Sequence, residues 1–292
     1  MRASRPAALL ALGLLAGCAT PARQAVADRD PVQPARQYQW LGSAEAAALS
    51  RQAYQALARY VVAAKARPDD SVVLAAGAGP ANPRFVPCGA KPAAVILDID
   101  ETSLLNTGAN YDAARRGDPP FDPARWDRWE KDGAAYVQPV PGSVEALAAL
   151  RAAGVTPIFI SNRDARNAGP AAAALGGAGL GPAVHGETLF LKGDVAPGSD
   201  KDPRRAAVAQ KWCVLAMVGD QLGDFSDRFN AKALTVAARR DLAQSEPIRA
   251  LWGAGWFLMP NPLYGPGTVG SFDDIFPTDK RWNGDAPTRS AP

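Results

Sequence analysis

Residues 95–102 read Val-Ile-Leu-Asp-Ile-Asp-Glu-Thr, a short apolar run that ends in two aspartates, Asp98 and Asp100. Its β-branched residues predict a buried parallel strand. Ligands of open α/β sheets collect outside the carboxyl ends of the strands, so both carboxylates are expected in a binding crevice. Two carboxylates this close cannot both stay ionised without a compensating charge. The stretch indicates a site for a divalent cation; the alternative is a strand end followed by an acidic turn.

Strand and helix patterns alternate along the chain after this strand. Such alternation predicts right-handed β-α-β crossovers and hence an α/β fold with a Rossmann-like parallel sheet. The expected strands are 93–98, 155–160, the short apolar segment 188–191, and 213–219; the expected helices are 142–153, 165–175 and 202–211.

Further segments flank the predicted sheet. Ser43 has capping chemistry for an amphipathic N-terminal helix that runs to about Lys65, and the core is expected to begin near Ala93. The connection between Asp100 and Pro141 is too long for a plain crossover, which predicts an inserted helical cap at about 103–140. The Pro- and Gly-rich stretch from Gly253 is expected to be mostly coil.

The first residues resemble a bacterial lipoprotein signal. Arg2 and Arg5 precede an apolar stretch that is too short to span a membrane stably and ends in Leu15-Ala16-Gly17-Cys18. This ending is similar to a lipobox, which implies a signal peptide at 1–17, lipidation of Cys18 and, from the residue that follows it, an outer-membrane location in the cell envelope. The alternative is an ordinary secretory signal.

Composition limits the partners. Cleavage after residue 17 would remove Arg2 and Arg5 and lower the formal charge from +3 to +1. A chain with so small a charge offers no global field for a nucleic-acid polymer. Residues 18–37 predict a tether, 38–280 the folded domain, and 281–292 a flexible tail. Cys88 and Cys213 are expected either to form a disulfide in an oxidising compartment or to remain buried thiols.

Three other motifs follow predicted strands. Residues 218–225 read Val-Gly-Asp-Gln-Leu-Gly-Asp-Phe and add two aspartates, Asp220 and Asp224. The strand 155–160 ends with Ser161, and Lys201 opens a helix. Four carboxylates at one sheet edge favour a hard cation with oxygen ligands, and Mg²⁺ is the best match.

These motifs, in this order, resemble the haloacid dehalogenase-like (HAD) superfamily. The cap insertion, Ser161-Asn162-Arg163, the motif at 218–225 and the lipobox are similar to those of class C bacterial acid phosphatases, over about residues 38 to 280. The resemblance implies a Mg²⁺-dependent acid phosphatase that hydrolyses small phosphomonoesters, with nucleoside 5'-monophosphates as the expected substrates, at the cell envelope.

The resemblance also implies roles for particular residues. Asp98 would be the nucleophile that forms an aspartyl-phosphate, and Asp100 the general acid, oriented by Thr102, with an acidic pH optimum if Asp100 must be protonated. Ser161 and Lys201 would hold the phosphoryl oxygens, with Lys192 as the alternative lysine. The metal would bind Asp98, the backbone carbonyl of Asp100, and Asp220, with Asp224 in the outer shell.

Other residues are expected around the entrance. The resemblance assigns substrate contacts to Asn162, Arg163, Trp126, Trp129 and Tyr264, whereas the two tryptophans could instead close the core of the cap. Arg204 and Arg205 follow Lys201 by one turn and are expected at the surface, Arg205 above all. The lone histidine, His185, is interpreted as structural.

Two other functions remain open from the sequence. One is a surface lipoprotein that binds a ligand or partner without turnover, and the other is a phosphatase for sugar phosphates or phosphoproteins. The oligomeric state is also open, with a dimer as one option.

Overall fold

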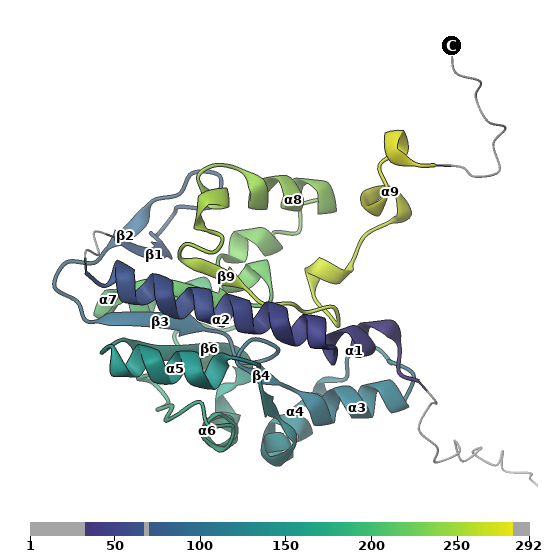
Figure 1. The fold of residues 1–292 in the computed structure, drawn as a ribbon, viewed down its shortest axis with the longest axis horizontal. Coiled ribbons are helices and arrows are strands. Elements are labelled where there is room, and N and C mark those ends of the chain that lie inside the picture. Colours follow the sequence, from purple (N-terminus) through teal and green to yellow (C-terminus); the bar gives the residue numbers. More distant parts are fainter. Residues whose placement is uncertain (1–32, 67–69, 283–292) are drawn as a thin grey trace, which may run out of the picture. The chain divides into compact units, whose positions relative to one another are not determined.

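The computed structural model describes residues 33–66 and 70–282. The predicted signal peptide, Cys18, most of the tether and residues 283–292 of the tail lie outside the described residues. Figure 1 shows the sheet with helices packed along it.

Five parallel strands form the central sheet, in the order β7-β6-β3-β8-β9. The α/β class and the parallel sheet expected from the sequence are confirmed. The strand of the Asp98 motif, β3, lies at the centre, where Leu97 pairs with Phe159 on one side and Val218 on the other. The strands are β3 (Ala93–Leu97), β6 (Thr156–Asp164), β7 (Leu189–Lys192), β8 (Cys213–Gly219) and β9 (Trp256–Leu258).

Helices cover both faces of this sheet. Alternate residues of β3 point to opposite faces: Val95 and Leu97 join one apolar cluster, and Ala94 and Ile96 the other. Residues of α2, α5 and α6 pack in the first cluster, whereas residues of α7 and α8 pack in the second. These helices are α2 (Ala44–Ala64), α5 (Ser143–Ala152), α6 (Ala168–Gly177), α7 (Asp202–Lys211) and α8 (Val236–Gln244).

The segment between β3 and α5 forms the helical insertion that the sequence predicts. Strands β4 (Leu104–Leu105) and β5 (Gln138–Pro139) pair antiparallel at its base. Helices α3 (Thr107–Arg115) and α4 (Pro123–Asp132) lie between these strands in sequence. Asp122 accepts hydrogen bonds from the backbone N–H groups of Ala124 and Arg125 and so caps α4. We call residues 103–140 the cap.

The structure adds elements that the sequence did not indicate in the flanking segments. The hairpin of β1 (Asp70–Leu74) and β2 (Phe85–Pro87) is a separate sheet that precedes β3, and β3 begins the central sheet at Ala93, as expected. The stretch predicted as mostly coil contributes one short strand, β9, whose Trp256 is fully buried. Three residues are too few to show a periodicity, so β9 gives no sequence signal. Helix α1 (Arg36–Leu41) begins inside the expected tether, and α9 (Phe272–Ile275) lies near the C-terminus.

A disulfide joins Cys88, just after β2, to Cys213, the first residue of β8. It connects the β1–β2 hairpin to the central sheet across 125 residues of sequence. Of the two states left open by the sequence, the structure has the paired one.

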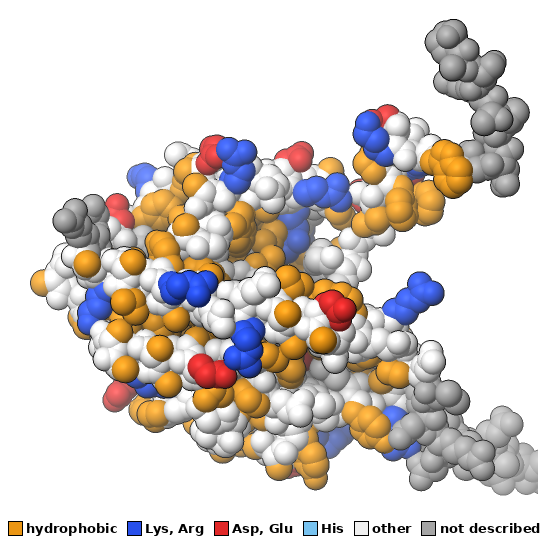
Figure 2. Space-filling model, in the orientation of Figure 1, with side chains coloured by type: hydrophobic (Ala, Val, Ile, Leu, Met, Phe, Trp, Pro, Cys, Tyr) orange, Lys and Arg blue, Asp and Glu red, His pale blue; other side chains and the backbone are white. Residues whose placement is uncertain are grey.

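The surface shows no concentration of one charge on the face drawn in Figure 2, where basic side chains are scattered among acidic and apolar ones. Within residues 33–66 and 70–282, no helix combines the length and the apolar character that a membrane span requires.

Candidate active site

Three aspartates meet at the carboxyl end of the sheet. Asp98 follows β3, Asp220 follows β8, and Asp224 lies one short turn further on, in Leu222–Asp224. The pairing of Leu97 with Val218 brings these strand ends together. One carboxylate oxygen from each aspartate lies within 4.8 Å of the other two, and all three residues are buried.

Burial and crowding make this cluster electrostatically costly without a cation. Burial raises the pKa of Asp98 well above its ordinary value; Lys201 opposes the rise, and Asp224 and Asp220 add to it. Burial, together with the charge of Asp224, raises the pKa of Asp220 to about 7. Three carboxylates around one small space are the oxygen donors that a hard divalent cation requires. These residues therefore fit a divalent metal ion.

Lys201 supplies the positive charge inside the cluster. Its Nζ lies 2.6 Å from Oδ1 of Asp98 and 2.6 Å from Oδ1 of Asp224. Lys192, the alternative phosphate lysine, instead lies 3.7 Å from Asp164 with a side chain that is 42 % exposed. The structure thus places Lys201, and not Lys192, beside the expected nucleophile.

The carboxylate of Asp100 has hydrogen-bond partners different from those of the three clustered aspartates. It accepts hydrogen bonds from Arg163 at 2.7 Å, Asn106 at 3.0 Å and Ser161 at 3.3 Å. Burial raises the pKa of Asp100, but the charge and hydrogen bonds of Arg163 and Asn106 outweigh it, so the net shift is downward. This shift favours the ionised form of Asp100, so a role as general acid requires protonation at acidic pH, and the acidic optimum stays a prediction.

Two predicted contacts are different in the structure. Arg163, expected to touch substrate, is buried against Asp100 and Asn106. The hydroxyl of Thr102, expected to orient Asp100, donates to Asp220 at 2.9 Å. Thr102 therefore orients one of the clustered carboxylates, as does Asn261, whose amide donates to Asp220 at 2.7 Å.

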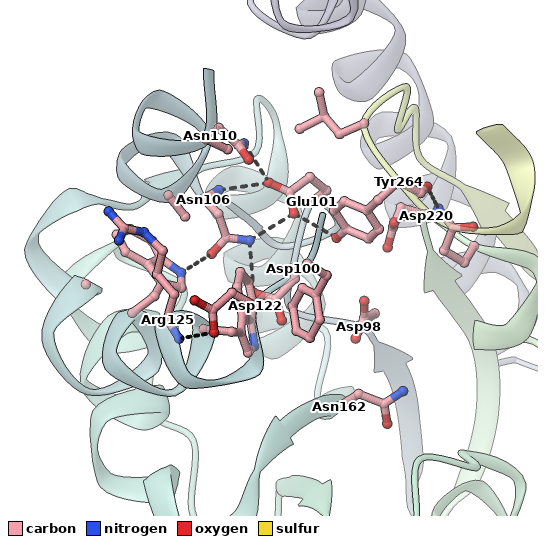
Figure 3. A pocket seen from close by; sticks show the side chains of 18 of the residues that line it. Asp98, Asp100, Glu101, Asn106, Asn110, Asp122, Arg125, Asn162, Asp220 and Tyr264 are labelled. Carbon is pink, nitrogen blue, oxygen red and sulfur yellow. Dashed lines mark hydrogen bonds between the residues drawn. The ribbon is translucent and has the colours of Figure 1, made fainter. Parts of the chain in front are cut away.

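Glu101 links the strand end at Asp98 to the cap and to the segment of Tyr264, and the sequence analysis gave it no role. Its buried carboxylate accepts hydrogen bonds from Asn106, Asn110 and the hydroxyl of Tyr264. Figure 3 shows the two asparagines of the cap on one side of Glu101 and Tyr264 on the other. Its backbone is left-handed, with φ of 53°. Glu101 follows Asp100 in a stretch that indicates a cation site or an acidic turn, and nothing in that stretch indicates its contacts with the cap and Tyr264.

A cavity of about 1380 Å³ opens above the clustered aspartates. Asn162, Trp126, Trp129 and Tyr264 line it, as expected from the sequence, whereas Arg163 does not. Trp129 donates its indole N–H to Asn106 at 3.0 Å, so it belongs both to the wall of the cavity and to the packing of the cap. The two interpretations of this tryptophan are therefore compatible.

Arg204 and Arg205 are not surface charges, contrary to the sequence-based expectation. Both are only 1 % exposed. They extend from α7 to the backbone of Ser161, in β6, and of Asp224, in the turn after β8, respectively. A buried arginine on a helix rich in polar residues has no distinguishing local pattern, which explains why sequence reasoning missed both.

Comparison with known proteins agrees with this geometry. The family model of HAD superfamily, subfamily IIIB (acid phosphatase) matches residues 37–267. The class C acid phosphatase of Bacillus anthracis, solved with tungstate bound, has a TM-score of 0.62 and 26% sequence identity, over 78% of this chain and 84% of that chain. Another structure of that enzyme gives the same values. No curated protein matches the sequence. The chain belongs to HAD subfamily IIIB, the acid phosphatases, and is a phosphomonoester hydrolase.

Proposed function

We propose that this enzyme is a Mg²⁺-dependent acid phosphatase that cleaves small phosphomonoesters through an aspartyl-phosphate. The observation that carries the proposal is the contact of one lysine, Lys201, with two of three clustered, buried carboxylates. A metal bound by Asp98, Asp220 and the backbone carbonyl of Asp100, with Asp224 in its outer shell, would neutralise charge on the transferring phosphoryl group.

The side chains then have separate tasks. An oxygen of Asp98 attacks phosphorus as the bond to the leaving oxygen breaks, and Lys201 stabilises the equatorial oxygens. Asp100, once protonated, gives its proton to the leaving oxygen and later removes one from the water that hydrolyses the acyl phosphate. Arg163 and Asn106 hold Asp100 in place for both proton transfers.

We propose nucleoside 5'-monophosphates as the substrates. The cavity above the aspartates is walled by Trp126, Trp129 and Tyr264, which offer aromatic faces for a base. Stacking on such faces is worth about 1–3 kcal/mol per base. Sugar phosphates would gain less from this wall, and a phosphoprotein would have to bring its phosphate past the cap.

We also propose that the enzyme is secreted and attached to the cell envelope, at the outer membrane, through lipid on Cys18. The support is the Leu15-Ala16-Gly17-Cys18 sequence after a short apolar stretch. Several acyl chains on one cysteine would make such anchoring stable. Metabolic labelling with a palmitate analogue, in the wild type and in Cys18→Ala, tests it; equal labelling of both would exclude the anchor.

Hydrolysis of 4-nitrophenyl phosphate with Mg²⁺, with EDTA, and with Mg²⁺ restored tests the catalytic proposal. We expect activity to vanish with EDTA and return with Mg²⁺, and Asp98→Ala to be inactive in both conditions. Asp241→Asn is the control, since Asp241 lies exposed on α8. A wild-type rate of turnover by Asp98→Ala would exclude Asp98 as the nucleophile. A panel of nucleotides, sugar phosphates and phosphopeptides then ranks the substrate classes by kcat/KM.

A further inference from the structure

The two arginines of α7 are buried at the back of the active site. Arg204 and Arg205 follow Lys201 by three and four residues, and each is 1 % exposed. A buried guanidinium is costly unless its N–H groups find partners. Their partners are therefore informative, and the two sets of partners do not overlap.

Arg205 holds the loop that carries Asp224. Its Nη1 donates to the backbone carbonyls of Gly223 at 3.0 Å and Asp224 at 2.8 Å. Its Nε and Nη2 donate to the carboxylate of Asp202, the first residue of α7, and its Nη2 lies 3.3 Å from Asp227. One planar side chain thus connects the helix of Lys201 to the loop of Asp224.

Asp202 and Asp227 complete this connection. The carboxylate of Asp227 accepts the backbone N–H groups of Lys201 at 2.9 Å and Asp202 at 2.6 Å. The carboxylate of Asp202 in turn accepts the backbone N–H of Asp227 at 3.2 Å. We call Asp202, Arg205 and Asp227 the clasp. The clasp fixes the backbones of Lys201 and Asp224, whose side chains meet in the acidic cluster.

Arg204 holds a different part of the site. Its Nη1 donates to the carbonyl of Ser161, and its Nη2 donates to Oδ1 of Asn162 at 2.6 Å. The same Nη2 reaches the carbonyls of Ser199 and Asp200, the two residues before Lys201. Arg204 therefore sets the position of the cavity wall at Asn162.

We propose that Arg205 is a positioning residue for metal binding and Arg204 a positioning residue for substrate binding. The inference rests on the proposed metal-dependent mechanism and adds a division of labour within α7. The planar guanidinium has five donors in a fixed arrangement, which a lysine cannot reproduce. Loss of outer-shell partners of a metal site reduces metal affinity about 10–100-fold.

The test compares Arg204→Ala, Arg205→Ala and Arg205→Lys with the wild type. Isothermal titration calorimetry gives the Mg²⁺ Kd, thermal unfolding gives the rise in Tm caused by Mg²⁺, and 4-nitrophenyl phosphate hydrolysis at saturating Mg²⁺ gives kcat and KM. Arg151→Ala is the matched control, because Arg151 also donates to a backbone carbonyl, that of Leu180, but lies away from the cavity.

We expect Arg205→Ala to weaken Mg²⁺ binding about 10-fold or more, with little change in KM. Arg205→Lys keeps the charge but not the planar donor set, so it should recover Tm more than Mg²⁺ affinity. Arg204→Ala should raise KM, and lower kcat, by about 10-fold or more, with Mg²⁺ affinity close to the wild type. Arg151→Ala should change neither Mg²⁺ affinity nor KM.

Unchanged Mg²⁺ affinity in the Arg205 variants would overturn the inference. It would also be overturned if Arg204→Ala and Arg205→Ala changed the Mg²⁺ Kd and the substrate KM to the same extent. If Arg205→Ala does not fold, Asp202→Ala decides: its side chain is 44% exposed, so its loss should be tolerated, and we expect weaker Mg²⁺ binding. Wild-type Mg²⁺ affinity in that variant would overturn the inference. A wild-type enzyme that binds no Mg²⁺ would instead refute the proposed function itself.

Discussion

Lys201 Nζ lies 2.6 Å from the carboxylate of Asp98, and both side chains are buried. Burial lowers the pKa of Lys201, but the charges of Asp224 and Asp98 outweigh it and the net pKa is raised. The lysine therefore stays protonated. It lowers the pKa of Asp98 against the effect of burial, which favours the ionised form that a nucleophile needs.

Replacing Lys201 with methionine should lower kcat about 10²–10³-fold, since one charged donor to the phosphoryl oxygens is lost. It should also destabilise the metal-free enzyme by about 3–5 kcal/mol, because buried carboxylates lose their cation. Added Mg²⁺ should restore part of this stability. Kinetics and urea unfolding measure the two effects.

Lys192→Met is the control for that substitution. Its side chain is 42 % exposed and pairs only loosely with Asp164, so kcat should remain near the wild-type value. A large loss of kcat in Lys192→Met, with little loss in Lys201→Met, would exchange the roles of the two lysines.

Replacing Arg163 with methionine should shift the pH dependence of kcat/KM. Arg163 lowers the pKa of Asp100, and activity that needs a protonated Asp100 is lost as the pH rises through that pKa. Without Arg163 the pKa rises, so the falling limb of the profile should move about one pH unit or more upward. If the falling limb of the profile stays at the same pH, or moves to lower pH, the assignment of Asp100 as the acid is contradicted.

The metal-free enzyme should lose stability as the pH rises through about 7. The pKa of Asp220 is raised to about 7 in the folded protein. The stability that protonated Asp220 contributes is therefore fully present when the pH lies below the pKa of this residue in the unfolded chain. It is lost as the pH rises through the pKa in the folded protein. Between pH 5.5 and 8.5 the loss should be about 2 kcal/mol, because one pKa unit corresponds to about 1.4 kcal/mol and the decline ends just above pH 7. Chemical unfolding with EDTA measures it.

Magnesium should abolish most of this pH dependence, because the metal replaces the proton as the partner of Asp220. In the absence of metal, Asp220→Asn should also abolish most of this pH dependence, because an amide does not titrate. The prediction would be contradicted if the free energy of unfolding fell equally steeply with pH in three samples: the wild type with Mg²⁺, the wild type with EDTA, and Asp220→Asn. Other titrating groups would then cause the pH dependence.

Sequence reasoning worked best where chemistry follows directly from a strand end. Asp98, Asp220 and Asp224 meet as expected, because parallel strands bring their carboxyl ends to one edge. It also located the helix that begins after Lys201, since the periodic pattern of α7 is long enough to be distinct.

It failed where a partner is distant in sequence. Whether Arg163 meets a substrate or Asp100 depends on the side-chain packing that buries it beside Asn106, which no local pattern encodes. The same holds for Thr102, whose partner Asp220 is 118 residues away. Propensity also gave no indication of β9, which has only three residues.

Reduction of the Cys88–Cys213 disulfide should destabilise the enzyme by about 2–5 kcal/mol, because the bond closes a loop across 125 residues. The clustered aspartates lie at the far end of β8 from Cys213, so kcat at low temperature should change little. Thermal unfolding with and without reductant measures the loss, and the Cys88→Ala, Cys213→Ala double variant should show no response. An oxidised enzyme with two free thiols would contradict the prediction.

The most direct measurement of the central claim is a crystal structure with Mn²⁺ in place of Mg²⁺, with the metal located by its anomalous scattering. The account predicts one strong peak bound by oxygens of Asp98 and Asp220, at about 2.0–2.2 Å, with Asp224 and Lys201 beside it. A peak elsewhere in a crystal saturated with Mn²⁺, with Asp98 and Asp220 making no contact to metal, would contradict it.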